Sequence, residues 1–314
     1  MSTKNAKIKL RAFRIENAAL TEPHSGILSL LQQVLSIDSM AQQRRMKLNE
    51  DDLDEDLLSN FEWAQSNQFL FGMMLRIIPA INGGVISSDL FNQQKITIAE
   101  VSTGNSNQSQ YKDHYYFAIN NNFVVTNLSG TYSIDRLQTY INWVLKDIRG
   151  ERLFELTPVT KIPEGVKLSE IKGIEFTGGS NATTFSAGTA EKSETKLHEL
   201  TQSLLDSIFS DTDTIADIKR SQIITAKLLL TVKKKPQEMA KDEYQKIMGA
   251  VTKNITNDSG ISLIAKNGNK YTGDAIKVVK DITVEKTTNN RLVEEELKQK
   301  MELFLNELRN SING

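Results

Sequence analysis

The sequence predicts an α+β protein with two mixed α/β domains that a Gly-, Ser- and Thr-rich linker joins. Three kinds of observation support this prediction. Several short stretches are apolar or alternate between apolar and polar residues, others repeat apolar residues at helical spacing, and the composition changes once within the chain. With 314 residues, of which 39% are hydrophobic and 25% charged, the chain is long enough to form two cores of ordinary size.

The first predicted domain spans residues 1–176 and mixes strands with two helices. Alternation or apolar runs predict strands at 8–12, 69–78, 95–101, 115–119, 123–126, 153–159 and 174–177. Asn120, Asn121 and Asn122 predict a hairpin turn between the two middle strands. Helical spacing predicts one helix from about Ser25 toward Met46 and another from the cap Ser133 to Leu145.

An acidic run interrupts this domain between Asn49 and Asp56. It contains the carboxylates Glu50, Asp51, Asp52, Asp54, Glu55 and Asp56. We expect a solvated loop or the start of a helix, because adjacent like charges repel one another when they are buried. A nucleic-acid mimic or a cation site is the alternative interpretation.

Small and polar residues dominate from Thr177 to Glu191, and we place the linker at 177–192. A phosphate-binding glycine loop is the alternative, but this segment lacks the lysine and the following helix of such loops. The second predicted domain is 193–314. Its elements are helices at 197–208, after Pro236 and at 290–308, and strands at 223–232, 261–265 and 275–284.

Residue content and missing motifs exclude several classes of protein. The chain has no cysteine, so it has no disulfide scaffold or thiolate chemistry, and this fits a reducing cytoplasm. Its three histidines, His24, His114 and His198, form no metal-binding spacing. No apolar stretch is long enough to span a bilayer, so we expect no direct membrane insertion. No P-loop or dinucleotide motif occurs.

Positive charge gathers in one window of a chain whose net charge is −1. From Lys219 to Lys286 there are 14 lysines and arginines against 7 acidic residues, which leaves +7. The candidate DNA-binding residues are Lys227, Lys233, Lys234, Lys235, Lys241 and Lys246. Lysines hold phosphates as point charges and read no bases, so this pattern favours contact with a duplex backbone. A solvated lysine-rich face is the alternative.

Catalysis has weaker support than binding. Asp206, Asp211, Asp213 and Asp217 could hold Mg²⁺, but single aspartates at such positions more often cap helices and turns. The strand that ends in Glu100, Val101 and Ser102 lacks the lysine of a restriction-type nuclease. We therefore expect no catalytic residue, no metal site and no cofactor.

Two regions resemble RexA-like phage-exclusion proteins. The first is Tyr115 to Leu145, where an aromatic strand, a polar turn, a second strand and an Asp-containing helix follow one another. The second is Ile223 to Leu308, where a strand leads into Lys233, Lys234 and Lys235, then a lysine-bearing helix, further strands and a final amphipathic helix. KwaB of the Kiwa anti-phage system is similar to a comparable extent.

This resemblance implies a two-domain, homodimeric, cytoplasmic protein of anti-phage defence. Such a protein would bind double-stranded DNA without sequence preference and signal to a separate membrane-protein partner during infection. Of the family's functional residues, the resemblance extends to Lys233, Lys234 and Lys235, with Lys227 and Lys241 as neighbours. The alternative function is a protein-interaction sensor that uses the acidic run and the leucine stripe of the last helix, with DNA binding incidental.

Overall fold

The structure is a computed structural model, and it describes residues 4–18, 26–36, 38–48, 54–64, 68–78, 84–86, 88–96, 109–128, 134–150, 153–166, 170–178, 226–231, 261–287 and 291–313. Helices and a curled antiparallel sheet occur together, which confirms the α+β class. The strands are β1 (Lys4–Ala18), β2 (Arg45–Lys47), β3 (Glu55–Trp63), β4 (Leu70–Ile78), β5 (Gly84–Ile86), β6 (Ser109–Ile119), β7 (Phe123–Thr126), β8 (Leu153–Pro158), β9 (Ile171–Gly178), β10 (Ala226–Thr231), β11 (Ile261–Ala265), β12 (Lys270–Tyr271) and β13 (Val279–Lys286).

The α-helices are α1 (Ile27–Val34), α2 (Asp135–Val144) and α6 (Glu294–Asn313), and the short 3-10 helices are η1 (Ala41–Arg44), η2 (Ser88–Asn92) and η7 (Gly273–Ala275). Within the residues that the structure describes, no helix has the length and hydrophobicity that crossing a bilayer requires.

The chain divides into two compact units, Met1–Leu156 with Val279–Gly314, and Thr157–Val278. This division differs from the predicted domains 1–176 and 193–314 in two ways: residues 157–176 belong to the second unit, and the C-terminal segment from Val279 returns to the first unit. There, β13 pairs with β1 in antiparallel register from Lys4 opposite Lys286 to Arg11 opposite Val279. Register between strands so far apart in sequence leaves no local signal, which is why the sequence pattern placed β13 in the second domain.

The predicted linker 177–192 overlaps the end of a strand. Its first two residues, Thr177 and Gly178, belong to β9, and residues 179–192 lie outside the described part of the chain. Ser133 and the helices expected at 197–208 and after Pro236 also lie outside it.

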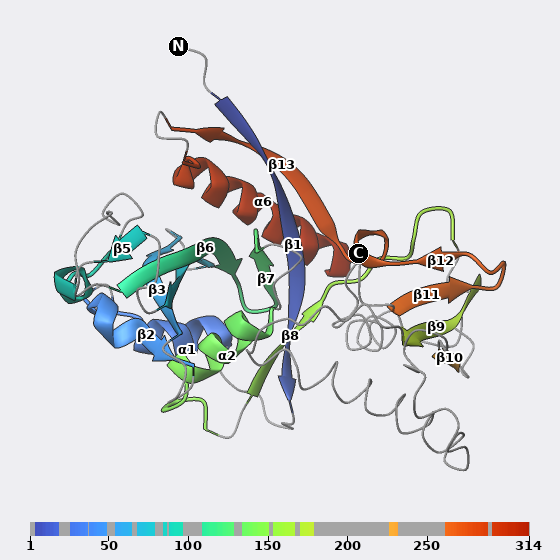
Figure 1. The fold of residues 1–314 in the computed structure, drawn as a ribbon, viewed down its shortest axis with the longest axis horizontal. Helices are drawn as coiled ribbons and strands as arrows, with labels where there is room; N and C mark the ends of the chain where they lie inside the picture. Colours follow the sequence, from blue (N-terminus) through green and yellow to red (C-terminus); the bar gives the residue numbers. More distant parts are fainter. Residues whose placement is uncertain are drawn as a thin grey trace, which may run out of the picture. The chain divides into compact units, whose positions relative to one another are not determined.

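A nine-stranded sheet forms the first unit (Figure 1), and seven strands follow the order β13-β1-β7-β6-β4-β3-β2, with β5 on β6 and β8 on β1. Successive side chains of a strand point to opposite faces. On β6, Tyr115 and Phe117 join the core with α1 and α2, while Tyr116 hydrogen-bonds Glu294 of α6 at 3.1 Å. Helices therefore cover both faces of this sheet.

A hydrophobic core lies between this sheet and helices α1 and α2. Its buried helical side chains include Ile27, Leu28, Leu30, Leu31, Leu137, Tyr140 and Ile141. The strands contribute apolar side chains that include Phe13, Leu58, Leu70, Met74, Phe117, Ile119 and Val124. The predicted hairpin at 115–126 is confirmed and supplies the centre of the sheet.

Helix α6 covers the other face and shields the outer edge of β13. Of the predicted stripe of Leu292, Leu297, Met301, Leu305 and Leu308, the last four are buried, at 0–5% exposure, whereas Leu292 precedes α6 and is partly exposed. At the edge, the Glu285 N–H donates to Glu296 at 2.6 Å, and Lys300 Nζ donates to the Thr283 carbonyl. These bonds occupy backbone groups with which another strand could otherwise pair.

The second unit contains a four-stranded antiparallel sheet in the order β10-β9-β11-β12. The predicted strand at 261–265 is confirmed as β11. The predicted turn that follows it contains Gly268, whose φ of 86° lies in the left-handed region that glycine adopts without strain.

The first unit departs from the expected pattern in two places. The helix expected from Ser25 toward Met46 ends at Val34, because the apolar repeat stops at Ser36, Asp38 and Ser39, and β2 follows η1. The acidic run was expected to be solvated, but that expectation is wrong at its end, where Glu55 and Asp56 begin β3 and are buried. Residues 49–53 lie outside the described residues.

Two other expected strands also differ from the structure. Of the segment 95–101, the structure describes Lys95 and Ile96, which are not in a strand. Over 275–284, the chain first completes η7 and enters β13 only at Val279.

Candidate functional site

The predicted DNA-binding residues fall mostly outside the described residues. Lys227 is the second residue of β10 and stands opposite Thr177 of β9. The other five, Lys233, Lys234, Lys235, Lys241 and Lys246, lie outside the described part of the chain. The joint surface of these six lysines therefore stays a prediction.

Other lysines of the basic window are better defined, and two of them meet carboxylates. Lys270 of β12 forms an ion pair with Glu175 of β9 in the second unit. Lys280 of β13 pairs with Glu307 of α6 at 2.5 Å in the first unit. A charge that is already paired contributes less to the attraction of phosphates. The basic window therefore attracts phosphates less strongly than its net charge of +7 suggests.

A buried charged cluster lies where α2 packs on the sheet, and the sequence pattern did not indicate it. Nε of Arg136 donates to both carboxylate oxygens of Asp56, at 2.8 and 2.7 Å. Asp54 lies 3.7 Å from Arg76 and 3.8 Å from Arg136. The positive charges of Arg136 on α2 and Arg76 on β4 are therefore balanced by the negative charges of Asp56 on β3 and Asp54 just before it.

Burial raises the pKa of the Asp56 carboxyl, while the hydrogen bond and the charge of Arg136 oppose that rise. The Tyr115 hydroxyl is buried nearby, and burial raises its pKa as well. A shifted carboxyl beside a tyrosine is one mark of an active site. Here Asp56 is fully buried, so a substrate cannot reach it, and we interpret this cluster as a structural link between α2 and the sheet.

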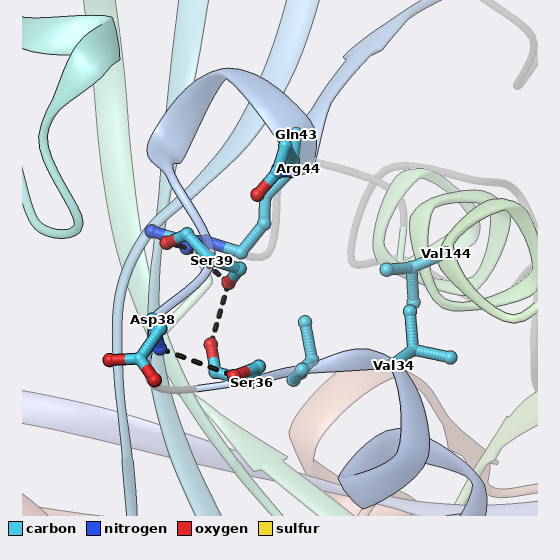
Figure 2. Close-up of a pocket in the computed structure, with 8 residues that line it drawn as sticks. Val34, Ser36, Asp38, Ser39, Gln43, Arg44 and Val144 are labelled. Carbon is cyan, nitrogen blue, oxygen red and sulfur yellow. Dashed lines mark hydrogen bonds between the residues drawn. The ribbon is translucent and has the colours of Figure 1, made fainter.

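A second feature is a cavity of about 440 Å³ beside η1 (Figure 2). Its lining residues are Val34, Leu35, Ser36, Asp38, Ser39, Gln43, Arg44 and Val144. The segment between α1 and η1 is held by Ser36, whose carbonyl accepts from the Ser39 hydroxyl at 2.7 Å and whose hydroxyl accepts from the Asp38 N–H at 3.3 Å. Polar groups of this segment therefore face apolar side chains across one cavity.

Arg44 is the notable residue of this cavity, because it is 2% exposed. Its Nε donates to the Leu58 carbonyl at 2.9 Å, and its Nη1 donates to the Ser39 hydroxyl at 2.7 Å and to the Ser39 carbonyl. Nη2 donates to the Gln94 carbonyl. The guanidinium also lies 5.1 Å from the centre of the Phe61 ring. No motif around Arg44 could have indicated these contacts, since its partners come from three separate segments.

The surfaces of the alternative function are mostly buried where they are described. The leucine stripe of α6 packs into the core of the first unit, and Leu303 is the exposed leucine of that helix at 60%. Glu55 and Asp56 at the end of the acidic run are buried as well. Among the described residues, no group of three or more histidines or carboxylates could hold a metal ion.

Comparison of the chain with models of known protein families and with curated proteins finds no match. Membership in the RexA-like or KwaB families therefore stays a prediction from the two resembling regions.

Proposed function

We propose that this protein is a non-enzymatic, sequence-nonspecific duplex-DNA-binding protein of a bacterial or prophage anti-phage defence system. The observation that carries the proposal is the excess of +7 between Lys219 and Lys286. Lys233, Lys234 and Lys235 follow shortly after the end of β10 at Thr231, and Pro236 comes next. Ammonium groups beside the end of a strand can meet phosphates without reading bases.

The proposal concerns a protein with two α/β parts, and the Gly-, Ser- and Thr-rich segment 177–192 lies within the second of them. It also includes a cytoplasmic homodimer that senses infection and signals to a separate membrane-protein partner, as the resemblance to RexA-like proteins implies. Light scattering coupled to size-exclusion chromatography tests the dimer, for which we expect twice the monomer mass of 35.3 kDa. A mass of 35.3 kDa at micromolar concentration would contradict it.

A mobility-shift assay with two duplexes of unrelated sequence tests the assigned surface. We expect Lys233→Glu/Lys235→Glu to weaken binding to both duplexes alike, because lysines that contact phosphates read no bases. Each lost phosphate contact should also reduce, by about 1, the steepness with which the logarithm of the association constant falls against the logarithm of salt concentration. The matched control is Lys7→Glu/Lys47→Glu, which makes the same charge change at two exposed lysines of the first unit. Equal weakening by both double variants would mean that total charge, and not this segment, attracts DNA.

The non-enzymatic part of the proposal has its own test. Supercoiled plasmid incubated with the full chain and Mg²⁺ should stay intact, whereas nicked or linear plasmid would show a nuclease. Asp211→Asn/Asp213→Asn should leave the plasmid as intact as the wild type does.

A further inference from the structure

Helix α6 has an outward face that differs from that of an ordinary surface helix. The helix packs on β6, β7 and β13 (Figure 1), and its buried side chains are Leu297, Met301, Phe304, Leu305 and Leu308. The opposite side of such a helix usually carries charged residues. Eight of the 20 residues of α6 are charged, but none of them lies on the line that points directly away from these buried side chains.

This outward line, which we call the neutral stripe, consists of Gln299, Leu303, Asn306 and Asn310. Its members are spaced by four, three and four residues, so they follow one another along one side of the helix. Leu303 is 60% exposed, more than any other large apolar side chain that the structure describes. Protein interfaces are depleted of charged residues at their centre, and the neutral stripe has this composition.

Two opposite charges lie beside the neutral stripe, both on the same side of it. Glu302 and Arg309 are separated by seven residues, which is about 10 Å along the helix axis, so they do not pair within one helix. Neither of them forms an ion pair with another residue that the structure describes. Both charges are therefore available to a partner that covers the stripe.

A second copy of α6 supplies a partner for both charges when the two helices run antiparallel. We align the pair so that Leu303 faces Asn306 of the second copy. In this register Glu302 and Arg309 of the second copy lie on the same side of the stripe, about 3 Å apart along the helix axis. Two-fold symmetry produces this contact twice. In a parallel pair Glu302 would instead approach Glu307 of the second copy, and these like charges would repel each other.

We propose that the neutral stripe is the contact between two copies of this chain, which pair α6 against α6 in antiparallel orientation. This inference rests on the homodimer of the proposed function and names the surface that forms it. Leu303 supplies the apolar centre of the contact, and the amide side chains beside it can donate and accept hydrogen bonds. Glu302 and Arg309 fix the orientation of the two helices.

Sedimentation equilibrium of the full chain without DNA measures the dissociation constant of the dimer. We expect Glu302→Arg to raise this constant about tenfold, because it turns both contacts with Arg309 of the second copy from attraction into repulsion. Arg309→Glu should have the same effect. Glu302→Arg/Arg309→Glu reverses both charges and should bring the constant back to within about threefold of the wild type. Glu164→Arg makes the same charge change at an exposed position of the second unit and should leave the constant unchanged.

Leu303→Glu tests the centre of the contact. It should raise the dissociation constant at least about tenfold, because it removes the apolar contact and places a charge in the interface. Since Leu303 is 60% exposed, the variant should keep α6 on the sheet, and an unchanged circular dichroism spectrum checks this.

Three results would overturn the proposal, and they differ in what they leave standing. A dimer that is unchanged in Leu303→Glu and in both single charge reversals forms through another surface, so the homodimer stands and the neutral stripe does not. A double reversal that recovers nothing contradicts the antiparallel register. A wild-type chain that stays monomeric overturns the homodimer together with this surface, whereas DNA binding is decided separately by the mobility shift.

Discussion

The carboxylate of Asp56 on β3 accepts the Nε hydrogen of Arg136 on α2 with both of its oxygens, at 2.8 and 2.7 Å, although 80 residues separate the two in sequence. Only 1% of the Asp56 side chain and 16% of the Arg136 side chain are exposed. The pair therefore joins a helix to the sheet inside the protein, where water screens charges weakly.

Removal of one partner should be strongly destabilising. Asp56→Ala leaves Arg136 buried without its closest carboxylate, and we expect the free energy of unfolding to fall by about 3–5 kcal/mol. Equilibrium urea unfolding followed by circular dichroism measures this change. Glu307→Gln, which breaks the solvent-exposed pair with Lys280, is the control and should cost no more than about 1 kcal/mol.

Replacement of both partners should cost less than the sum of the two single changes. In Asp56→Leu/Arg136→Met no buried charge of this pair remains, so the double variant should recover part of the loss. A double variant that loses as much stability as the two single variants together would show that the two residues act independently.

The start of α1 depends on an asparagine from the distant hairpin turn. The Leu28 N–H donates to Asn121 Oδ1 at 3.1 Å, and a Cβ on Gly26 would stand 2.3 Å from that oxygen. We expect Asn121→Ala to lower the free energy of unfolding by about 1 kcal/mol through loss of this cap. Gly26→Ala should lower it too, because the alanine methyl group displaces the Asn121 side chain.

Thermal unfolding followed by circular dichroism measures both variants of this cap. Asn122→Ala changes the neighbouring exposed asparagine of the same turn and should shift stability by less than about 0.5 kcal/mol. If Asn121→Ala matches Asn122→Ala, the side chain of Asn121 does not cap α1.

His114 should make the protein less stable as the pH falls. Burial lowers the pKa of His114 below 6.5, Asp113 opposes this shift, and Arg291 adds to it. The unfolded chain therefore takes up a proton at about pH 6.5, while the folded protein stays neutral at this position until a lower pH. Stability from this group is complete above pH 6.5 and is lost as the pH falls below it.

Urea unfolding of the wild type and His114→Gln at several pH values between 8 and 5 tests this sign. As the pH falls, the free energy of unfolding of the wild type should decrease relative to that of His114→Gln. A constant difference between the two proteins over this range would show that His114 titrates alike in the folded and unfolded chains.

Much of the local structure could be predicted because it depends on local periodicity. The hairpin 115–126, strand β4 and the buried stripe of α6 follow from alternation, apolar runs and helical spacing. The end of the acidic run could not be predicted, because the buried Asp56 is paired with Arg136 from another part of the chain. Likewise, nothing near β13 indicates that it pairs with β1.

The candidate sites show the same limit. A count of charges identified the lysine window, but the pair between Lys270 and Glu175 joins residues 95 positions apart and reduces its effect. The cavity beside η1 had no sequence signal. Arg44 looks like an ordinary charged residue of a polar segment, and its burial depends on oxygens of Ser39, Leu58 and Gln94.

Fluorescence anisotropy with one labelled duplex over a series of salt concentrations tests the central claim most directly. Contact of six lysines with phosphates predicts a slope of roughly −5 for the logarithm of the association constant against the logarithm of salt concentration. The ion pairs of Lys270 and Lys280 do not change this expected slope, because these two lysines are not among the six. A slope near zero, or no binding at about 50 mM salt, would contradict the account.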